Sequence, residues 1–385
     1  MIPSGYKQTE IGVIPEDWEI VALLSKCDLL NGLTYTPYDV SDNGLLVIRS
    51  SNVQNGQFTF SDIVFVVLSI DEKHLIKKND IVICVRNGSA SLIGKCAKAK
   101  QDYNATFGAF MAVLRGDNND YIYQVLQQGT IQKLINKNSD ATINQITNGD
   151  FKNIKIAFPA DVIERKKIAE ALSDVDELIA SLEKLIEKKK ALKQGVMQEL
   201  LTGKRRLPGF SGEWIISNQL FEVVKGEQIN GSELQDDLPY PLYNGGVSAS
   251  GYTSDYNFEN KVIISEGGNS CGYINYIKTK FWAGGHCYVV VNAKVLNDYL
   301  YQLLKLHETN IMALRVGSGL PNIQKEELKK LRFSYPKDTE EQQAIVKVLD
   351  DIDIYIKHMT DKLNKFRKIK TGMMSELLTG KIRIK

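Results

Sequence analysis

The sequence predicts an α+β protein in which two similar domains of mixed α/β structure alternate with two long helices. Three observations predict this class. The helical stretch at residues 162–201 is repeated at residues 339–378, a globular segment precedes each copy, and both segments open in the same way. A repeat of this length indicates a repeated structural unit. We expect the helices to form an intrachain antiparallel coiled coil, which would give the molecule an approximate two-fold axis.

The two helical stretches align without gaps from Ile146 and Ile323 to Arg206 and Arg383. In the second copy, apolar residues recur at alternating steps of four and three, which is typical of a coiled-coil seam. In the first copy, Lys189 and Lys193 interrupt the same stripe. Neither copy contains proline, and each is followed closely by glycine, as helices commonly are. Roughly 40 residues at about 1.5 Å each make a rod of about 60 Å.

A single amphipathic helix would ordinarily pack on its own domain. Two matched narrow seams in one chain favour a helix paired with its own copy instead, because each narrow stripe needs a similar partner. The seam residues that we expect at this interface are Leu172, Ile179, Leu349, Ile352 and Ile356.

The composition is that of an ordinary globular protein, with 385 residues, 43% hydrophobic content, 24% charge and a net charge of +2. Five cysteines show no C-x-x-C spacing, so we expect reduced core thiols and no metal site. No apolar run reaches membrane-spanning length, and the N-terminal residues lack the pattern of a signal peptide. A cytoplasmic protein with no membrane partner is expected.

The chain order predicts a first domain at residues 1–158, a helix at 159–204, a second domain at 205–335 and a second helix at 336–385. Apolar and β-branched runs at 45–57, 62–67, 80–100 and 107–116 predict strands separated by turns. Residues 121–136 have the spacing of one helix. The second domain repeats this plan with strands at 261–277 and 286–293 and a helix at 298–306, but it is shorter.

Motifs for catalysis are weak. The chain has no phosphate-binding loop and no strand-linked G-x-G-x-x-G. The run Asp237-Leu238-Pro239-Tyr240 faintly resembles an adenine-binding motif of amino-methyltransferases, but a turn explains it better. The four histidines are scattered, without a nucleophile pattern. Catalysis by this chain alone is therefore not expected.

Polar, glycine-containing loops between the strands are the remaining candidate sites. Arginine pairs with guanine edges, asparagine pairs with adenine, and glycine lets the backbone approach a phosphate. Each loop alone is typical of a turn, but on two domains they together predict a bipartite reader of double-stranded DNA. The candidate DNA-binding residues are Arg49, Ser50, Asn52, Arg86, Asn87 and Lys95 in the first domain, and Asn244, Gly245, Asn269 and His286 in the second.

These features resemble the specificity subunit of Type I restriction-modification systems. The resemblance covers nearly the whole chain: the opening segment at 5–18, the Pro-x-x-x-x-Glu-x-x-x-Ile start of both helices and the Leu-Leu-Thr-Gly-Lys end of both. The segment Gly317-Ser318-Gly319-Leu320-Pro321-Asn322-Ile323 is similar to the close of a target recognition domain in that family.

The resemblance implies two target recognition domains that each read half of an asymmetric, interrupted DNA site, with the paired helices as a ruler between them. It also implies two methyltransferase subunits and restriction subunits with translocase activity as partners. S-adenosylmethionine, ATP and Mg would be bound by those subunits, and this chain would carry no cofactor. Two alternatives remain open: a coiled-coil protein whose end domains bind protein, and a self-contained methyltransferase or nuclease.

Overall fold

The computed structural model describes residues 2–137, 144–230, 234–235, 237–317, 319 and 321–384. Ser318 and Leu320 of the segment that closes the second domain lie outside the described residues. The chain divides into two compact units. Met1–Glu183 and Lys362–Lys385 form the first unit, and Lys184–Asp361 forms the second. Each long helix therefore contributes residues to both units.

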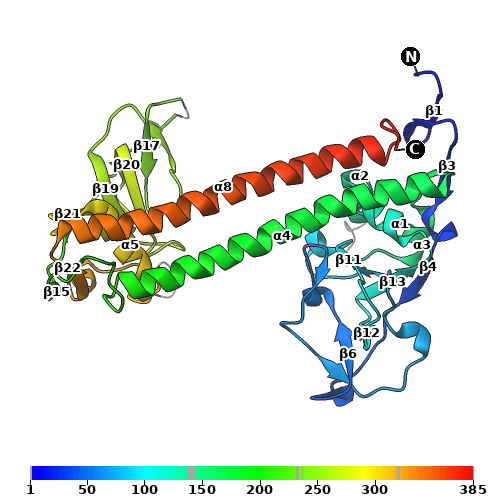
Figure 1. The fold of residues 1–385 in the computed structure, drawn as a ribbon, viewed down its shortest axis with the longest axis horizontal. Helices are drawn as coiled ribbons and strands as arrows, with labels where there is room; N and C mark the ends of the chain where they lie inside the picture. The colour runs from blue at the N-terminus through cyan, green and yellow to red at the C-terminus, as the bar shows by residue number, and fades with distance from the viewer. Residues whose placement is uncertain are drawn as a thin grey trace. The chain divides into compact units, whose positions relative to one another are not determined.

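The first unit contains strands β1 to β14, helices α1 to α3 and parts of both long helices (Figure 1). Its strands are β1 (Tyr6–Thr9), β2 (Gly12–Pro15), β3 (Trp18–Ala22), β4 (Asp28–Asn31), β5 (Val40–Ser41), β6 (Leu45–Ile48), β7 (Val53–Gln54), β8 (Gln57–Phe58), β9 (Phe65–Val66), β10 (Ile81–Cys84), β11 (Cys96–Lys98), β12 (Ala105–Phe107), β13 (Met111–Arg115) and β14 (Lys155–Pro159). Its short helices are α1 (Asn119–Leu126), α2 (Gly129–Lys137) and α3 (Asn148–Asn153).

The second unit repeats this plan with fewer strands. They are β15 (Trp214–Ser217), β16 (Glu222–Lys225), β17 (Tyr240–Tyr243), β18 (Gly251–Thr253), β19 (Phe258–Ser265), β20 (Ile274–Ala283), β21 (Cys287–Val291) and β22 (Phe333–Pro336). Its short helices are α5 (Asn297–Leu306), α6 (Glu308–Met312) and α7 (Lys325–Lys329), and the two long helices are α4 (Val162–Leu200) and α8 (Thr339–Leu377).

Four strands have the same order in the two units. The order β4-β13-β10-β11 in the first unit is matched by β16-β21-β19-β20 in the second. A parallel pair adjoins each, β6 with β12 in one case and β17 with β20 in the other. In each unit the strand that opens the segment pairs with the last strand before the long helix, as β3–β14 and β15–β22. The predicted α+β class with two similar mixed domains is confirmed.

The predicted helix at 298–306 is confirmed as α5, but the single helix expected at 121–136 is wrong. The chain there forms α1 and α2, which are separated after Leu126. Gly129 opens the second of them, and glycine disfavours a continuous helix because it loses more backbone freedom than other residues. The apolar spacing continues across the break, which is why periodicity alone missed it.

Helices α1 and α5 carry nearly the same sequence, Asn-Asp-Tyr-Ile-Tyr-Gln and Asn-Asp-Tyr-Leu-Tyr-Gln, and both attach a domain to its long helix. The Gln124 side chain donates from Nε2 to Asp176 Oδ2 of α4 at 3.0 Å. The equivalent Gln302 donates to Asp350 Oδ1 of α8 at 3.3 Å. Both glutamines are buried, so these bonds fix the orientation of each domain's helical layer on its long helix.

The long helices pair antiparallel within each unit. In the first unit, Asp176 and Glu183 of α4 form ion pairs with Lys370 and Arg367 of α8, in reverse order, with N···O distances of 2.5 Å each. The helices run side by side there in Figure 1.

In the second unit, the Lys189 ammonium lies 4.9 Å from the Tyr355 ring centroid, and Lys193 Nζ lies 2.7 Å from Asp353 Oδ2. The lysines that interrupt the seam of α4 therefore contact partners on α8. The predicted antiparallel helix pair is confirmed in each unit.

Each unit has a hydrophobic core that both long helices help to build. In the first unit, Ile168 and Leu172 of α4 pack with Leu377 of α8 and with the residues of the domain. In the second unit, Ile345 and Leu349 of α8 pack in the same core as Met197, Leu200 and Leu201. The five cysteines are free and buried, as predicted. None of the described helices is both long enough and apolar enough to cross a membrane.

A buried carboxylate closes the first unit. Glu164, in the first turn of α4, is 1% exposed and accepts a hydrogen bond from the indole N–H of Trp18 at 3.1 Å. Arg383, beyond the end of α8, reaches the same carboxylate at 2.5 and 2.8 Å and donates to Asp17 at 2.9 and 2.7 Å. These acidic partners raise the pKa of the Arg383 guanidinium, which therefore stays charged.

The second unit contains the equivalent closure. Arg206, beyond the end of α4, donates to both carboxylate oxygens of Glu341 at 2.5 and 2.7 Å. Glu341 lies in the first turn of α8 and is fully buried, and the Arg206 guanidinium also lies 5.6 Å from the Trp214 ring centroid. The residue after one long helix thus neutralises the buried acid at the start of the other, in both units.

Substitution Arg383→Ala should destabilise the first unit by about 3 kcal/mol, because it leaves the buried Glu164 carboxylate without its cation. Hydrogen exchange of backbone amides in the first unit, measured over a series of denaturant concentrations, would give the loss of stability. Arg205→Ala is the matched control, because the Arg205 side chain is 74% exposed and its ion pair with Glu199 spans 3.5 Å. The control should change stability by less than about 0.5 kcal/mol. Equal stability of the two variants would contradict the role of the closure.

Candidate nucleic-acid interface

At one end of the sheet in the first unit, backbone hydrogen bonds hold several loops together. Gly108 N–H donates to Ile48 C=O at 3.0 Å, and Val85 N–H donates to Phe110 C=O at 2.9 Å. Ile146 N–H then donates to Val85 C=O at 2.9 Å. Segments that lie far apart in the chain therefore converge at the loops 49–51, 86–89 and 108–110. We call this set the first reading face.

The second unit builds the same frame from its own loops. Gly284 N–H donates to Tyr243 C=O at 2.8 Å, Glu266 N–H to His286 C=O at 2.9 Å and Ile323 N–H to Glu266 C=O at 2.9 Å. The loops 244–246, 266–269 and 284–286 form the second reading face. Each residue occupies the place of its counterpart in the first unit, so the two faces are equivalent in backbone and differ in side chains.

Both frames require glycine at one further position. A Cβ atom added at Gly32 would lie 2.0 Å from the carbonyl oxygen of Gly108, and one added at Gly226 would lie 2.3 Å from that of Gly284. Any side chain at either position would collide with backbone. Both reading faces therefore depend on a close approach between a glycine and the carbonyl group of another glycine.

Several predicted residues meet on the first reading face. Asn87 Nδ2 donates to Ser50 Oγ at 3.1 Å, and Lys95 Nζ donates to Ser50 C=O at 3.4 Å. Arg49 forms an ion pair with Asp62 at 2.7 Å. A hydrogen bond from Ser51 and the Arg49 charge lower the pKa of the Asp62 carboxyl group. The loops are thus cross-linked by polar side chains before any ligand binds.

The same face contains a hollow of about 450 Å³. Its wall includes the predicted residues Arg49 and Ser50 and two aromatic residues that the sequence analysis did not select, Tyr35 and Phe110. Phe110 is 53% exposed, and the Arg86 guanidinium carbon lies 5.3 Å from its ring centroid. Alignment of the equal-length segments 107–111 and 283–287 on Gly108 and Gly284 places Phe110 opposite His286, which was a predicted residue, so this comparison could have found the position.

Asn52 does not belong to the exposed set, which corrects the prediction made for it. Its side chain is fully buried. The Asn52 amide donates to Thr59 C=O at 3.1 Å and to Asp62 C=O at 2.7 Å, and its oxygen accepts from Arg49 N–H at 3.0 Å. All of these bonds lie within the loop, so Asn52 supports the shape of the first reading face and cannot contact a base.

On the second reading face, Asn244 and His286 lie together as predicted residues. His286 N–H donates to Asn244 Oδ1 at 3.2 Å, and both residues line a hollow of about 530 Å³. Asn269 lies on the loop 266–269 of the same face, and its side chain is exposed. Glu266, which the sequence analysis missed, also lines the hollow and forms an ion pair with Lys225 at 2.8 Å.

Gly245 is buried, and its backbone groups are already occupied. Its N–H donates to Cys287 Sγ at 3.0 Å, and its C=O accepts from the hydroxyls of Ser265 and Ser270. Burial raises the pKa of the Cys287 thiol to about 11, so this group stays neutral. Gly245 therefore holds the frame instead of offering a backbone contact to a phosphate, which corrects the prediction for it.

The residues expected at the helix pair differ in burial. Leu172 and Leu349 are fully buried, each in the core of its own unit. Ile179, Ile352 and Ile356 are half-buried along the helices.

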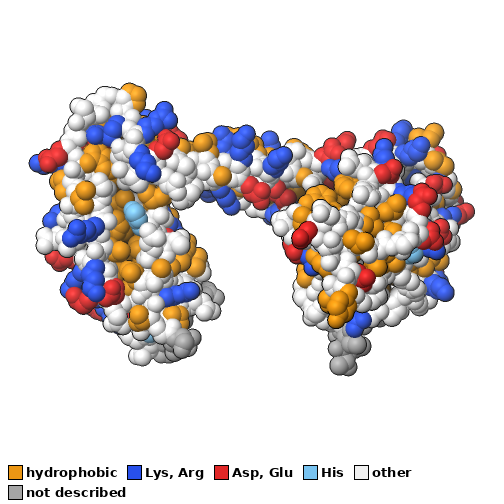
Figure 2. Space-filling model, turned by 90° about the horizontal axis from the view of Figure 1, so that it is seen from below, with side chains coloured by type: hydrophobic (Ala, Val, Ile, Leu, Met, Phe, Trp, Pro, Cys, Tyr) orange, Lys and Arg blue, Asp and Glu red, His pale blue; other side chains and the backbone are white. Residues whose placement is uncertain are grey.

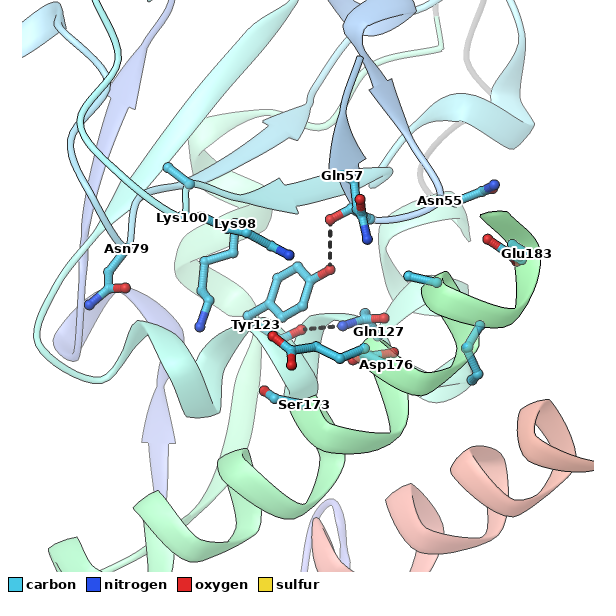
Figure 3. Close-up of a pocket in the computed structure, with 15 residues that line it drawn as sticks. Asn55, Gln57, Asn79, Lys98, Lys100, Tyr123, Gln127, Ser173, Asp176 and Glu183 are labelled. Atoms are coloured by element: carbon cyan, nitrogen blue, oxygen red, sulfur yellow. Dashed lines mark hydrogen bonds between the residues drawn. The ribbon is translucent and has the colours of Figure 1, made fainter. Parts of the chain in front are cut away.

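A third hollow, of about 380 Å³, lies where the first domain meets α4 (Figure 3). Figure 3 shows the Tyr123 hydroxyl donating to Gly56 C=O, at 3.2 Å, with Ser173 and Asp176 of α4 nearby. Three of its five charged lining residues, Lys98, Asp176 and Glu183, are engaged in ion pairs. This hollow is therefore part of the junction between domain and helix, and the reading faces remain the candidate interface.

Charges of both signs alternate over the surface drawn in Figure 2, and hydrophobic side chains lie among them. Among the described residues on that face, no broad region carries only Lys and Arg.

The fold and the two equivalent faces define a protein with two recognition domains of one design. The family model for the Type I restriction modification DNA specificity domain matches residues 15–194 and 217–367. Since these matches cover most of the chain, it belongs to this family.

The chain is similar to the StySPI specificity subunit of Salmonella potsdam, at 32% identity over 50% of this chain and 44% of that protein. It is also similar to the EcoKI specificity subunit of Escherichia coli K12, at 31% identity over 57% of this chain and 51% of that one. The match thus spans about half the length of these relatives. A putative MjaX specificity subunit of Methanocaldococcus jannaschii is 27% identical over 99% of this chain and 97% of its own.

The crystal structure of a Type-I restriction-modification system S subunit from M. genitalium has the same fold. Its TM-score is 0.66 at 20% identity, with 97% of this chain and 98% of that one covered. A chain from structural work on complex assembly and conformational transition of the type I R-M system gives a TM-score of 0.55 at 14% identity, covering 96% and 99%.

Substitution Asn52→Ala should lower the free energy of unfolding by about 1–3 kcal/mol, because it leaves buried carbonyl and N–H groups without partners. Asn269→Ala is the control, since Asn269 is exposed on the other reading face. It should leave stability within about 0.5 kcal/mol of the wild type. Thermal or chemical unfolding measures both, and an Asn52 variant as stable as the control would show that the amide does not support the loop.

Proposed function

We propose that the chain is the DNA sequence-specificity subunit of a Type I restriction-modification enzyme and that it recognises a bipartite, asymmetric site. The observation that carries this function is the repeated reading face, with one backbone frame and two different sets of side chains. One frame suits one mode of docking on DNA, and different side chains suit different bases. Residues 1–158 and 205–335 are the target recognition domains in this proposal.

The chain is a recognition subunit without catalytic activity in this proposal. Methyltransferase subunits supply S-adenosylmethionine and modify adenine, and restriction subunits use ATP and Mg. Two of the thiols are consistent with this proposal. Burial raises the pKa of Cys27 and of Cys96 to about 12, so both stay protonated and are poor nucleophiles.

The long helices offer a surface for these partners. With the seam residues as positions a and d of a heptad, Leu178 and Leu192 of α4 and Tyr355 and Ile369 of α8 all fall at position g. They are between 37% and 49% exposed. In an antiparallel pair, the g positions of both helices flank the same side of the seam. Leu178 and Ile369 thus form an apolar flank in the first unit, and Tyr355 and Leu192 form its equivalent in the second.

Two equivalent flanks suit two copies of one partner, and we assign them to two methyltransferase subunits. Exposed apolar residues at matched positions favour a protein partner, since single exposed residues without a pattern would need no explanation. In the first unit the opposite flank carries the ion pair between Glu183 and Arg367, both at position e. The charged side chains on that flank are therefore already paired within the chain.

Exchange of residues 214–322 for the corresponding segment of a relative should change the bases recognised in one half of the DNA site and leave the other half unchanged. The reason is that each reading face is completed within its own unit. Mapping of methylated adenines, in cells that carry the exchanged chain and its methyltransferase, reads both halves. A change in both halves would contradict independent reading. A protein-binding scaffold, the alternative, would show no salt-dependent DNA binding.

The double substitution Leu178→Asp and Ile369→Asp should reduce the number of bound methyltransferase subunits from two to one, because it places carboxylates on one apolar flank. Native mass spectrometry of the assembled complex counts the subunits. Ser181→Asp is the matched control, since Ser181 is exposed on the same stretch of α4, away from position g. Two bound subunits in the double variant would refute the assignment of the flank.

A further inference from the structure

The first reading face contains one arginine that is presented differently from the others. Arg49, on the same face, is tied to Asp62 at 2.7 Å, and Arg115, at the other end of β13, is tied to Asp80 at 2.6 Å. Arg86 is exposed, and its guanidinium is paired with no carboxylate among the described residues. It lies over the ring of Phe110, with 5.3 Å between the guanidinium carbon and the ring centroid. A ring holds the face of a guanidinium and leaves its N–H edges free.

Three contacts hold the loop that begins at Arg86 in place. Asn87 N–H donates to Asn144 C=O at 3.2 Å, and Asn144 Nδ2 donates to Gly88 C=O at 3.0 Å. Ser89 N–H donates to Asn87 Oδ1 at 3.0 Å. Arg86 N–H itself donates to Phe110 C=O at 3.2 Å. Both the backbone and the side chain of Arg86 are therefore ordered before DNA arrives, which lowers the entropy that binding would otherwise cost.

We infer that Arg86, stacked on Phe110, determines specificity by donating to O6 and N7 of a guanine in the half-site read by the first unit. A free guanidinium edge matches these two acceptors in the major groove, and no other base presents the same pair. Phe110 positions the guanidinium, and its exposed ring contacts the neighbouring base, where a thymine methyl group gives the best apolar surface. This inference rests on the proposed function and adds the base that one residue reads.

The second unit has different residues at the two positions that carry this inference. The equivalents of Arg86 and Phe110 are Gly267 and His286, because Val85 and Glu266 occupy the same place in the two frames. Gly267 has no side chain, so the second face cannot read guanine through this position. The two half-sites should then differ at the corresponding base, although the backbone frames agree.

The test uses the complex with its methyltransferase subunits and a library of DNA duplexes randomised within both half-sites. Arg86→Lys keeps the charge but loses the fork that donates two parallel hydrogen bonds. It should reduce the preference for guanine at one position of the first half-site by about 5- to 150-fold. The second half-site and the salt dependence of binding should stay unchanged. Phe110→Ala should weaken the preference for guanine at the same position and the preference for thymine beside it.

Each outcome separates the inference from the function on which it rests. If the wild-type complex selects a bipartite site and Arg86→Lys has the same base preferences, the inference is wrong and the function stands. If the wild-type complex selects no sequence, the proposed function itself fails. A uniform loss of affinity in Arg86→Ala that Arg86→Lys restores in full would assign Arg86 to a phosphate and overturn its role as a guanine reader.

Discussion

Both units depend on a buried carboxylate at the start of a long helix and on the arginine that neutralises it. Glu164 and Glu341 lie in first helical turns, where a negative charge is favoured by the helix dipole. Burial nevertheless makes each acid costly unless a cation pairs with it. Arg383 and Arg206 provide that cation from beyond the end of the other helix. Each unit therefore needs both long helices, and residues 1–183 should not form a stable unit without the last residues of the chain.

The second constraint joins each domain to its helix. Gln124 and Gln302 are buried amides that donate to carboxylates on the long helices. Asn119 and Asn297 begin the same helices and donate to the carbonyls of Asn79 and Asn260, at 2.8 Å each. The segments of Asn79 and Asn260, the short helix and the long helix are thereby connected by polar bonds, of which those of Gln124, Gln302 and Asn119 are part-buried and costly to break. The sheet of each unit is in this way attached to its long helix through the short helix.

Much of the fold could be predicted because its signals are local. The seam follows from the spacing of apolar residues, and the closing arginines lie inside the gapless repeat that ends at Arg206 and Arg383. The reading faces were only partly predictable, because the bond between Gly108 and Ile48 joins residues far apart in the chain. Asn52 was misassigned for a chemical reason: an amide that could pair with adenine is equally suited to bond the backbone of its own loop.

The frame of each reading face consists of bonds between backbone N–H and C=O groups, and this has a consequence for how specificity is stored. The side chains of Arg49 and Asn244 occupy equivalent places and add one contact each, to Asp62 and to His286 N–H, outside those backbone bonds. A change of base-reading residue therefore costs the frame little, whereas a change at Gly32 or Gly226 would drive a side chain into backbone. The shared frame is thus carried by backbone atoms, and the differences between the two faces are carried by side chains. That separation explains how one chain can hold two readers with one architecture and different chemistry.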